Sequence, residues 1–165
     1  DFIDPLMAFW FTFVFHHRDE LDNGKDIETL EEIKRQFPTY IQYWYKIVCK
    51  EIFITACRQG NIPFRTDHVG EFFSKNGEDI DIIGIDDQHN RIFFGDCFYN
   101  NRQYTMDMFD DFVEECKAAK EFKPYKEYTW IFGAFSASPF DNDLMDYALI
   151  TPNIILFEGV TVYKK

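Results

Sequence analysis

Two aspartates stand in neighbouring apolar runs with the spacing of a carboxylate pair. Asp81 lies within the run Ile80 to Ile85, and Asp96 lies within the run Arg91 to Tyr99. The residues between these runs, 86 to 90, are turn formers, so the sequence predicts a β-hairpin. If the hairpin is symmetric about its midpoint, Asp81 lies directly opposite Asp96 on one face of the sheet.

Such a pair could bind a metal ion. Directly opposed residues have Cβ atoms roughly 4.5–5.5 Å apart, and two carboxylates about 5 Å apart repel by about 3 kcal/mol at an effective dielectric near 20. A bound divalent cation, a shared proton or full solvation would relieve this repulsion. Mg²⁺ accepts one or two carboxylates and can polarise a phosphate and activate a water. Asp81 and Asp96 are therefore candidate metal ligands and catalytic residues, with Mg²⁺ as the cofactor.

Two other arrangements of the same residues remain open. One aspartate could face solvent at the end of its strand, or a bulge could break the register. Glu71, on the strand expected before the pair, could add a third ligand. His16 and His17 are adjacent on an expected helix and point in different directions, so they favour a helix end or surface. One expected helix has an acidic face, which indicates a solvated surface. Its residues are Asp107, Asp110, Asp111, Glu114 and Glu115.

Hydrophobic periodicity indicates the elements that position the hairpin. Before it, one helical pattern ends at Phe37, where Pro38 interrupts it, and a stronger one runs from Ile41 to Ile52. An earlier strand is expected within Pro63 to Phe73. After the hairpin the pattern predicts a helix at 109–116, a strand at 128–135, a short helix at 143–149 and a strand at 154–157. This order predicts an α/β fold, a central mixed sheet of about four or five strands flanked by helices.

Composition limits the function classes. Of 165 residues, 17 are basic and 29 acidic, which gives a net charge of −12. This balance excludes a strongly basic DNA-binding module, because affinity for phosphate comes from Lys and Arg. Aromatic residues make up 19% of the chain, which excludes a disordered tail.

The cysteines and the N-terminal segment indicate a compartment. No two of the four cysteines have CxxC spacing, so the sequence predicts free thiols in a reducing, cytoplasmic compartment. The apolar run from Leu6 to Phe15 is too short to span a bilayer, and the residues before it are acidic, unlike a signal peptide. No membrane partner is expected. Because no Met opens the chain, we expect it to be a piece of a longer protein.

The hairpin resembles the core of the PD-(D/E)XK nucleases, in which a strand with an Asp is followed by (Asp/Glu)-x-Lys on the next strand. The segment Asp4 to Phe15, with Arg18-Asp19-Glu20-Leu21 after it, is similar to the segment that follows the winged helix in archaeal-type AAA+ ATPases, which bacteria also have. Gly77 to Gly84 and Gly95 to Phe98 resemble two signature strands of the C-terminal domain of unknown function in those proteins. The resemblance covers nearly the whole chain. It implies a PD-(D/E)XK nuclease-like (restriction-endonuclease-like) core with the order α-β-β-β-α-β and a helical N-terminal extension.

The resemblance also assigns residues and shows two departures. Asp81 falls on the metal-binding Asp, and Asp96 falls on the second acid, where Glu is commoner. Phe98 falls on the Lys, and Lys46 falls where the first core helix often has an acid. Losing one positioned electrostatic donor typically costs about 10²–10³ in rate. The lysines that could substitute from other elements are Lys75, Lys117 and Lys120.

These features predict a degenerate nuclease-like C-terminal domain of a cytoplasmic AAA+ ATPase, which acts as an interaction or DNA-contacting module. The expected domains are a helical linker segment at 1–37 and a nuclease-like α/β domain at 38–165. The linker would pack on upstream ATPase and winged-helix parts through Phe9 to Phe15, and its exposure in the isolated piece favours a homodimer. The alternatives are a weak Mg²⁺-dependent DNA endonuclease that uses Asp81 and Asp96, and a structural oligomerisation domain.

Overall fold

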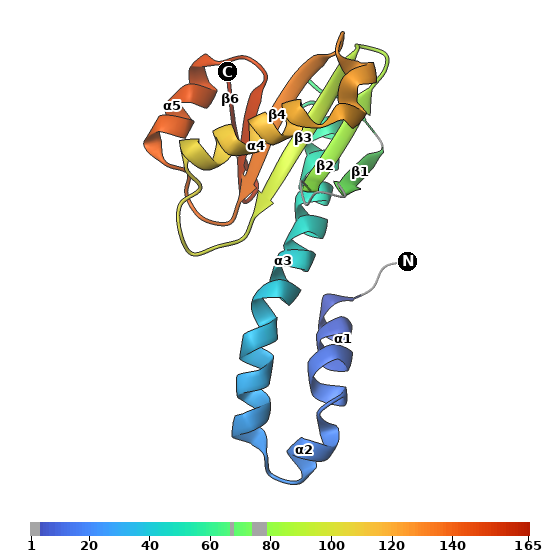
Figure 1. Cartoon of the computed structure of the whole chain (residues 1–165), viewed down its shortest axis with the longest axis vertical. Coiled ribbons are helices and arrows are strands. Elements are labelled where there is room, and N and C mark those ends of the chain that lie inside the picture. The colour runs from blue at the N-terminus through green and yellow to red at the C-terminus, as the bar shows by residue number, and fades with distance from the viewer. Residues whose placement is uncertain (1–3, 67, 74–78) are drawn as a thin grey trace. The chain divides into compact units, whose positions relative to one another are not determined.

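The chain contains two compact units. The computed structural model describes residues 4–66, 68–73 and 79–165, and its internal contacts divide it between Trp44 and Tyr45 (Figure 1). The long helix α3 (Asp26–Gln59) contributes to both units. Lys75, Gly77 and Glu78, which entered the sequence interpretation, lie outside the described residues.

The first unit is helical and largely exposed. It consists of α1 (Pro5–Phe9), the π-helix η1 (Trp10–Phe15), α2 (Arg18–Asp22) and the beginning of α3. Asp4 caps α1, because its carboxylate accepts the amide of Leu6 at 2.8 Å. In η1 only Phe13 is buried. The large apolar side chains of this segment that remain exposed are Leu6, Met7, Trp10, Phe11 and Phe15.

The prediction that Pro38 interrupts the helix is wrong, because α3 continues through this residue. Proline removes one hydrogen bond from a helix interior and leaves the carbonyl four residues earlier without its usual donor. Pro38 and Lys34 both lie outside the buried core, so solvent can satisfy that carbonyl. At its other end α3 closes at Gly60, whose φ of 70° is the left-handed conformation that glycine adopts without strain.

The second unit is built on a six-stranded mixed sheet in sequential order. The pairs β1–β2, β2–β3 and β5–β6 are antiparallel, whereas β3–β4 and β4–β5 are parallel. The strands are β1 (Val69–Phe73), β2 (Asp79–Asp86), β3 (Arg91–Phe98), β4 (Thr129–Ser136), β5 (Ile154–Glu158) and β6 (Thr161–Lys164).

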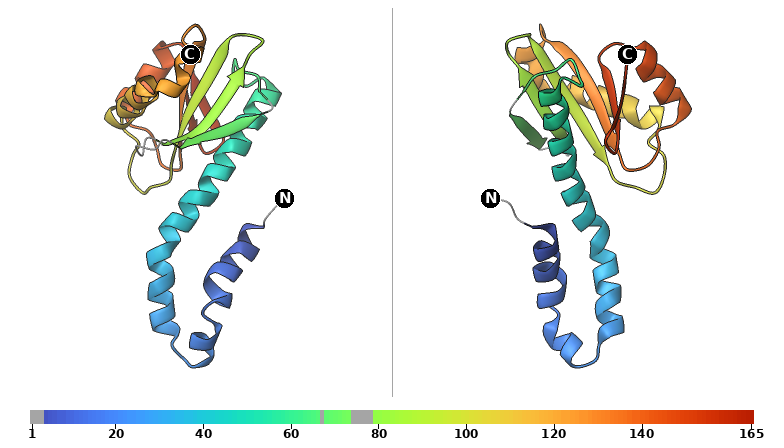
Figure 2. Two further views of the ribbon diagram at one scale, coloured as in Figure 1. Left: turned by 45° about the vertical axis from the view of Figure 1, so that its right-hand side comes forward. Right: turned by 180° about the vertical axis from the view of Figure 1, so that it is seen from behind.

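Helices cover both faces of this sheet (Figure 2). On one face, the part of α3 that begins at Tyr45 packs Cys49 and Phe53 against Ile82 and Phe93. On the other face lie α4 (Met106–Ala118), the 3₁₀-helix η2 (Lys120–Tyr125) and α5 (Asn142–Ile150). Asp141 links two of these helices, since its carboxylate accepts the amides of Met106 at 3.0 Å and Leu144 at 2.8 Å.

The predicted mixed α/β class is confirmed, as is the order of elements from the hairpin onward. The order α3, β1, β2, β3, α4, β4 is also the α-β-β-β-α-β order that the resemblance implies. The predicted strand number was too low, because β6 was not expected. In the part of the chain that the structure describes, no helix is both long and apolar enough to cross a membrane.

Candidate functional site

The hairpin has the register that its symmetry predicts. The ladder between β2 and β3 runs from Asp86 opposite Arg91 to Ile82 opposite Gly95. Continuing this register by one residue places the backbone of Asp81 opposite that of Asp96. The two aspartates therefore leave the sheet at the same end of the hairpin.

A bulge between β1 and β2 redirects the first of these side chains. Gly70 pairs with Ile83 and Phe72 with Ile80, so Asp81 and Ile82 together oppose one residue of β1. A bulge of this kind breaks the strict alternation of side chains. Ile82 packs in the core beneath α3, and Asp81 is bonded to α3 as well.

Asp81 is a buried carboxylate with two internal partners. Its Oδ1 forms an ion pair with the ammonium of Lys46 on α3. Its Oδ2 accepts a hydrogen bond from the backbone N–H of Cys97 at 3.0 Å. Burial alone would lower the pKa of Lys46, but the pairing with Asp81 outweighs burial and raises it. Lys46 is therefore charged, and it supplies the positive charge that Asp81 needs.

Asp96 is held differently. Its Oδ2 accepts a hydrogen bond from the hydroxyl of Tyr104 at 2.6 Å. Tyr104 belongs to the core beneath α4, whereas Cys97, the next residue of the strand, belongs to the core beneath α3. By the alternation of a strand, Asp96 faces the α4 side. Desolvation raises the pKa of Asp96 to about 6, and the nearby charge of Asp81 adds to this effect.

The expectation that both carboxylates share one face is not met. They approach the peptide group of Cys97 from opposite faces of the sheet, Asp81 toward α3 and Asp96 toward Tyr104. The repulsion between them is relieved by the ammonium of Lys46 and by the raised pKa of Asp96. Among the described residues, no group of three or more His, Cys, Asp or Glu side chains could hold a metal ion.

Phe98 occupies the position that the resemblance gives to lysine, and it brings a different cation to the site. Its ring lies 5.3 Å from the ring of Tyr104. The guanidinium of Arg102 lies 5.7 Å from the centre of the Phe98 ring, in a cation–π contact. The sequence did not indicate a role for Tyr104 or Arg102, because the loop that carries them has no regular period.

The other candidate residues have partners of their own. Glu71 forms an ion pair with Lys50, which lies one helical turn beyond Lys46 on α3. The carboxylate of Glu71 is therefore paired with a lysine of its own. Lys46 and Lys50 are four residues apart on α3, so they lie on the same side of the helix. Lys117, one of the lysines that could have substituted at the site, pairs with Glu114 at 2.9 Å on an exposed helix face.

The histidines and cysteines show no reactive arrangement. His16 contacts the carbonyl of Phe11 at 2.6 Å, and His17 contacts Glu20 at 3.0 Å. The four cysteines are buried thiols. Burial raises the pKa of the Cys97 thiol well above its usual value, and the adjacent Cys49 raises it further. A thiol with a raised pKa is a poor nucleophile, so covalent catalysis by Cys97 is not supported.

The fold and the site define an α/β protein with a lysine-neutralised aspartate at the open end of a hairpin. Residues 10–121 match the DUF234 family, described as archaeal and bacterial proteins of unknown function, and the chain belongs to this family.

The comparisons also indicate that relatives are longer. The chain is 29% identical over 91 residues to the uncharacterized protein MJECL04 of Methanocaldococcus jannaschii. This match covers 55% of the chain but spans only about a fifth, 20%, of that relative's length. No solved structure matches the chain.

Proposed function

We propose that the second unit is a nuclease-like domain without nuclease activity, which acts as an interaction module of a longer protein. In this proposal, the ammonium of Lys46 supplies the positive charge that a metal ion supplies in an active nuclease, and the carboxylates of Asp81 and Asp96 stabilise the fold. The longer protein is an AAA+ ATPase, as the sequence resemblance implies, and the greater length of the archaeal relative is compatible with that context.

The ion pair between Lys46 and Asp81 is the observation that supports this proposal. A carboxylate that already holds an ammonium and a backbone N–H has little remaining capacity for a divalent cation. Phe98 adds to the argument, because an aromatic ring cannot support an attacking water as the expected lysine would.

Removal of Lys46 tests the proposal. We expect Mg²⁺ or Mn²⁺ to leave the melting temperature of the wild type unchanged. The variant Lys46→Ala is expected to lose about 1–3 kcal/mol of stability, because it leaves a buried carboxylate without its partner. Added Mn²⁺ should restore part of that loss. Lys46→Gln provides a second variant with better hydrogen bonding, in case the alanine variant folds poorly.

Lys50→Ala is the matched control, since it breaks the neighbouring pair with Glu71 on the same helix. Its stability should not respond to Mn²⁺. A clear rise in the wild-type melting temperature with metal, abolished by Asp81→Asn, would contradict the proposal.

A second candidate function is Mg²⁺-dependent cleavage of DNA. The observation that favours it is that the charges of Asp81 and Lys46 both act on Asp96, although the two carboxylates lie on opposite faces of the sheet. Purified protein should then nick supercoiled plasmid with Mn²⁺, and Asp96→Ala should abolish nicking. In the non-catalytic proposal the plasmid stays intact, and Phe98→Lys is the variant in which nicking could be regained.

A further inference from the structure

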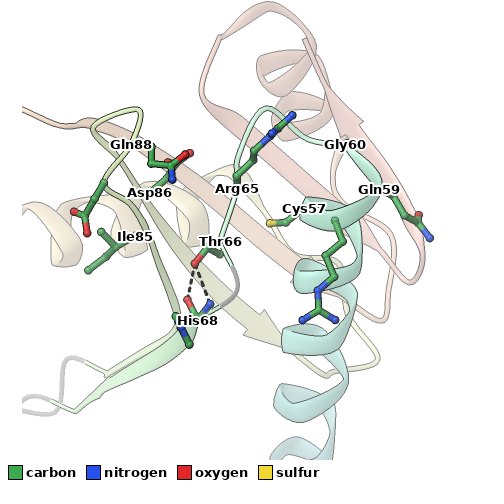
Figure 3. Close-up of a pocket in the computed structure, with 11 residues that line it drawn as sticks. Cys57, Gln59, Gly60, Arg65, Thr66, His68, Ile85, Asp86 and Gln88 are labelled. Atoms are coloured by element: carbon green, nitrogen blue, oxygen red, sulfur yellow. Dashed lines mark hydrogen bonds between the residues drawn. The ribbon is translucent and has the colours of Figure 1, made fainter.

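A second polar site lies at the far end of the same hairpin. A cavity of about 700 Å³ is bordered by the end of α3, the segment that follows it and the tip of the β2–β3 hairpin (Figure 3). Asp86 at this end is five residues from Asp81 along β2, or about 16 Å at 3.3 Å per residue. The cavity is therefore separate from the carboxylates described above. Its volume falls within the range of roughly 300–1,000 Å³ that is usual for small-molecule sites.

Arginines gather at this cavity in a chain that is otherwise acidic. Arg58 and Arg65 line it. A neighbouring cavity of about 400 Å³ also includes Arg65 and is bordered by Arg91, whose guanidinium donates to the carbonyl of Pro63. These are three of the six arginines of a chain whose net charge is −12. His68 also lines the larger cavity, and His89 lines the smaller one.

In the described part of the wall, the carboxylates of Asp86 and Asp87 are bonded to other groups. Asp86 is buried and accepts the His89 ring nitrogen at 2.9 Å and the His89 amide at 3.2 Å. Burial alone would raise the pKa of Asp86, but these bonds to His89, together with the Arg65 amide, lower it. Asp87 accepts the hydroxyl of Tyr128 at 2.9 Å. Both carboxylates therefore serve the framework of the hairpin.

The backbone around the cavity is also satisfied. The carbonyls of Ala56 and Cys57 at the end of α3 accept the amides of Asn61 at 3.0 Å and Gly60 at 3.2 Å. The negative end of the helix dipole is thus partly compensated. Thr66 fixes the adjoining segment, because its hydroxyl is hydrogen-bonded to both the carbonyl and the amide of His68 (Figure 3).

We propose that this cavity binds a phosphate-bearing small molecule. Arginine guanidinium groups bind phosphate oxygens through paired N–H donors, and Arg65 is common to both cavities. The amides of Gln59 and Gln88 offer hydrogen bonds to the rest of the ligand, while Ile85 and Cys57 provide apolar contact. The site uses none of the residues on which the proposed function rests, Lys46, Asp81 and Phe98, so the two proposals can fail independently.

Calorimetric titration of the whole chain tests this site, with inorganic phosphate and adenosine monophosphate as probes. We expect the nucleotide to bind the wild type, and Arg65→Ala to weaken binding about tenfold, equivalent to about 1.4 kcal/mol. Arg35→Ala is the matched control, because Arg35 is exposed and pairs with Glu32 outside both cavities. It should bind like the wild type.

Several results would overturn the proposal. One such result is that neither probe binds the wild type. Another is that Arg65→Ala binds the nucleotide as tightly as the wild type, when circular dichroism shows both proteins to be folded. Arg65→Lys serves if the alanine variant does not fold, and it should retain part of the affinity because it keeps the charge. A single-stranded oligonucleotide that binds more tightly than the mononucleotide, with the same dependence on Arg65, would replace the small molecule by a nucleic acid strand.

Discussion

At the scale of single residues, the Cys97 peptide group organises the candidate site. Its N–H donates to Asp81 from one side, and the carboxyl of Asp96 lies next to it on the other. A backbone N–H at the end of a ladder would otherwise lose its partner, and Asp81 replaces the strand carbonyl that ends there. The carboxylate of Asp81 therefore has a structural role whether or not the domain acts on a substrate.

Asp96 should make the stability of the fold depend on pH. Its folded-state pKa of about 6 lies above the ordinary carboxyl value. The protonated form therefore stabilises the fold, and this contribution is fully present below about pH 4 and is lost as the pH rises through about 6. Urea unfolding should give the free energy of unfolding of the wild type and of Asp96→Asn at each pH. Relative to the variant, the wild type should lose about 1–3 kcal/mol of stability as the pH rises across this range.

Tyr104→Phe provides the control for that prediction. Its hydroxyl bond lowers the pKa of Asp96 relative to burial alone. Removing the hydroxyl should move the pH transition upward without eliminating it. A difference between wild type and Asp96→Asn that is constant with pH would show that Asp96 does not titrate as described.

The residue scale also shows how far sequence reasoning reaches into the site. The register of the hairpin, from Asp86 opposite Arg91 to Ile82 opposite Gly95, could be predicted, because it follows from the symmetry of one short turn. The pairing of Lys46 with Asp81 could not, since it joins positions far apart in the chain and depends on how α3 packs on the sheet. The bulge that turns Asp81 toward α3 has no local sequence signal.

At the scale of elements, a cluster of rings controls how closely the strands and α3 approach. Phe53 of α3 stacks on Phe93 of β3, with ring centres 4.1 Å apart. Phe93 in turn fills the space above a glycine of the next strand. A Cβ built on Gly133 would lie 2.5 Å from the Phe93 ring and 2.9 Å from the carbonyl oxygen of Ile155. The packing therefore requires glycine at this position.

We expect Gly133→Ala to destabilise the second unit by about 1–3 kcal/mol, because both the ring and a backbone carbonyl would have to move. The matched control is Gly70→Ala, which introduces the same methyl group in a strand where nothing lies within 4 Å. Chemical denaturation of the two variants provides the comparison. Equal stabilities would contradict the close approach of β4 to Phe93.

The elements differed in how readily the sequence revealed them. Strands β2 and β3 are long apolar runs around a clear turn, and both were predicted within two residues of their ends. Strand β6 was missed because its few residues, Thr161 to Lys164, lie at an edge and show no buried face. Pro38 indicated a helix end where packing and solvent exposure allow the helix to continue.

At the scale of the whole molecule, net charge bears on the choice between an interaction module and a DNA-contacting module, which the sequence left open. The net charge is −12, and the outer face of α4 alone exposes Asp107, Asp110 and Asp111. A protein binds the DNA backbone by replacing counterions with Lys and Arg side chains. With this balance, we expect the chain by itself to have low affinity for DNA.

We therefore expect the chain alone to leave duplex DNA unshifted in an electrophoretic mobility assay at physiological salt. Reversing Asp107, Asp110 and Asp111 to lysine on the exposed face of α4 raises the net charge by two at each position, and it should produce weak retention that declines steeply with added salt. That variant shows that the assay detects contacts of this size. Salt-dependent retention of DNA by the wild type would mean that a local basic surface, such as the arginines at the hairpin tip, outweighs the global charge. The DNA-contacting form of the module would then be preferred, and Arg65→Ala would show whether the hairpin tip is that surface.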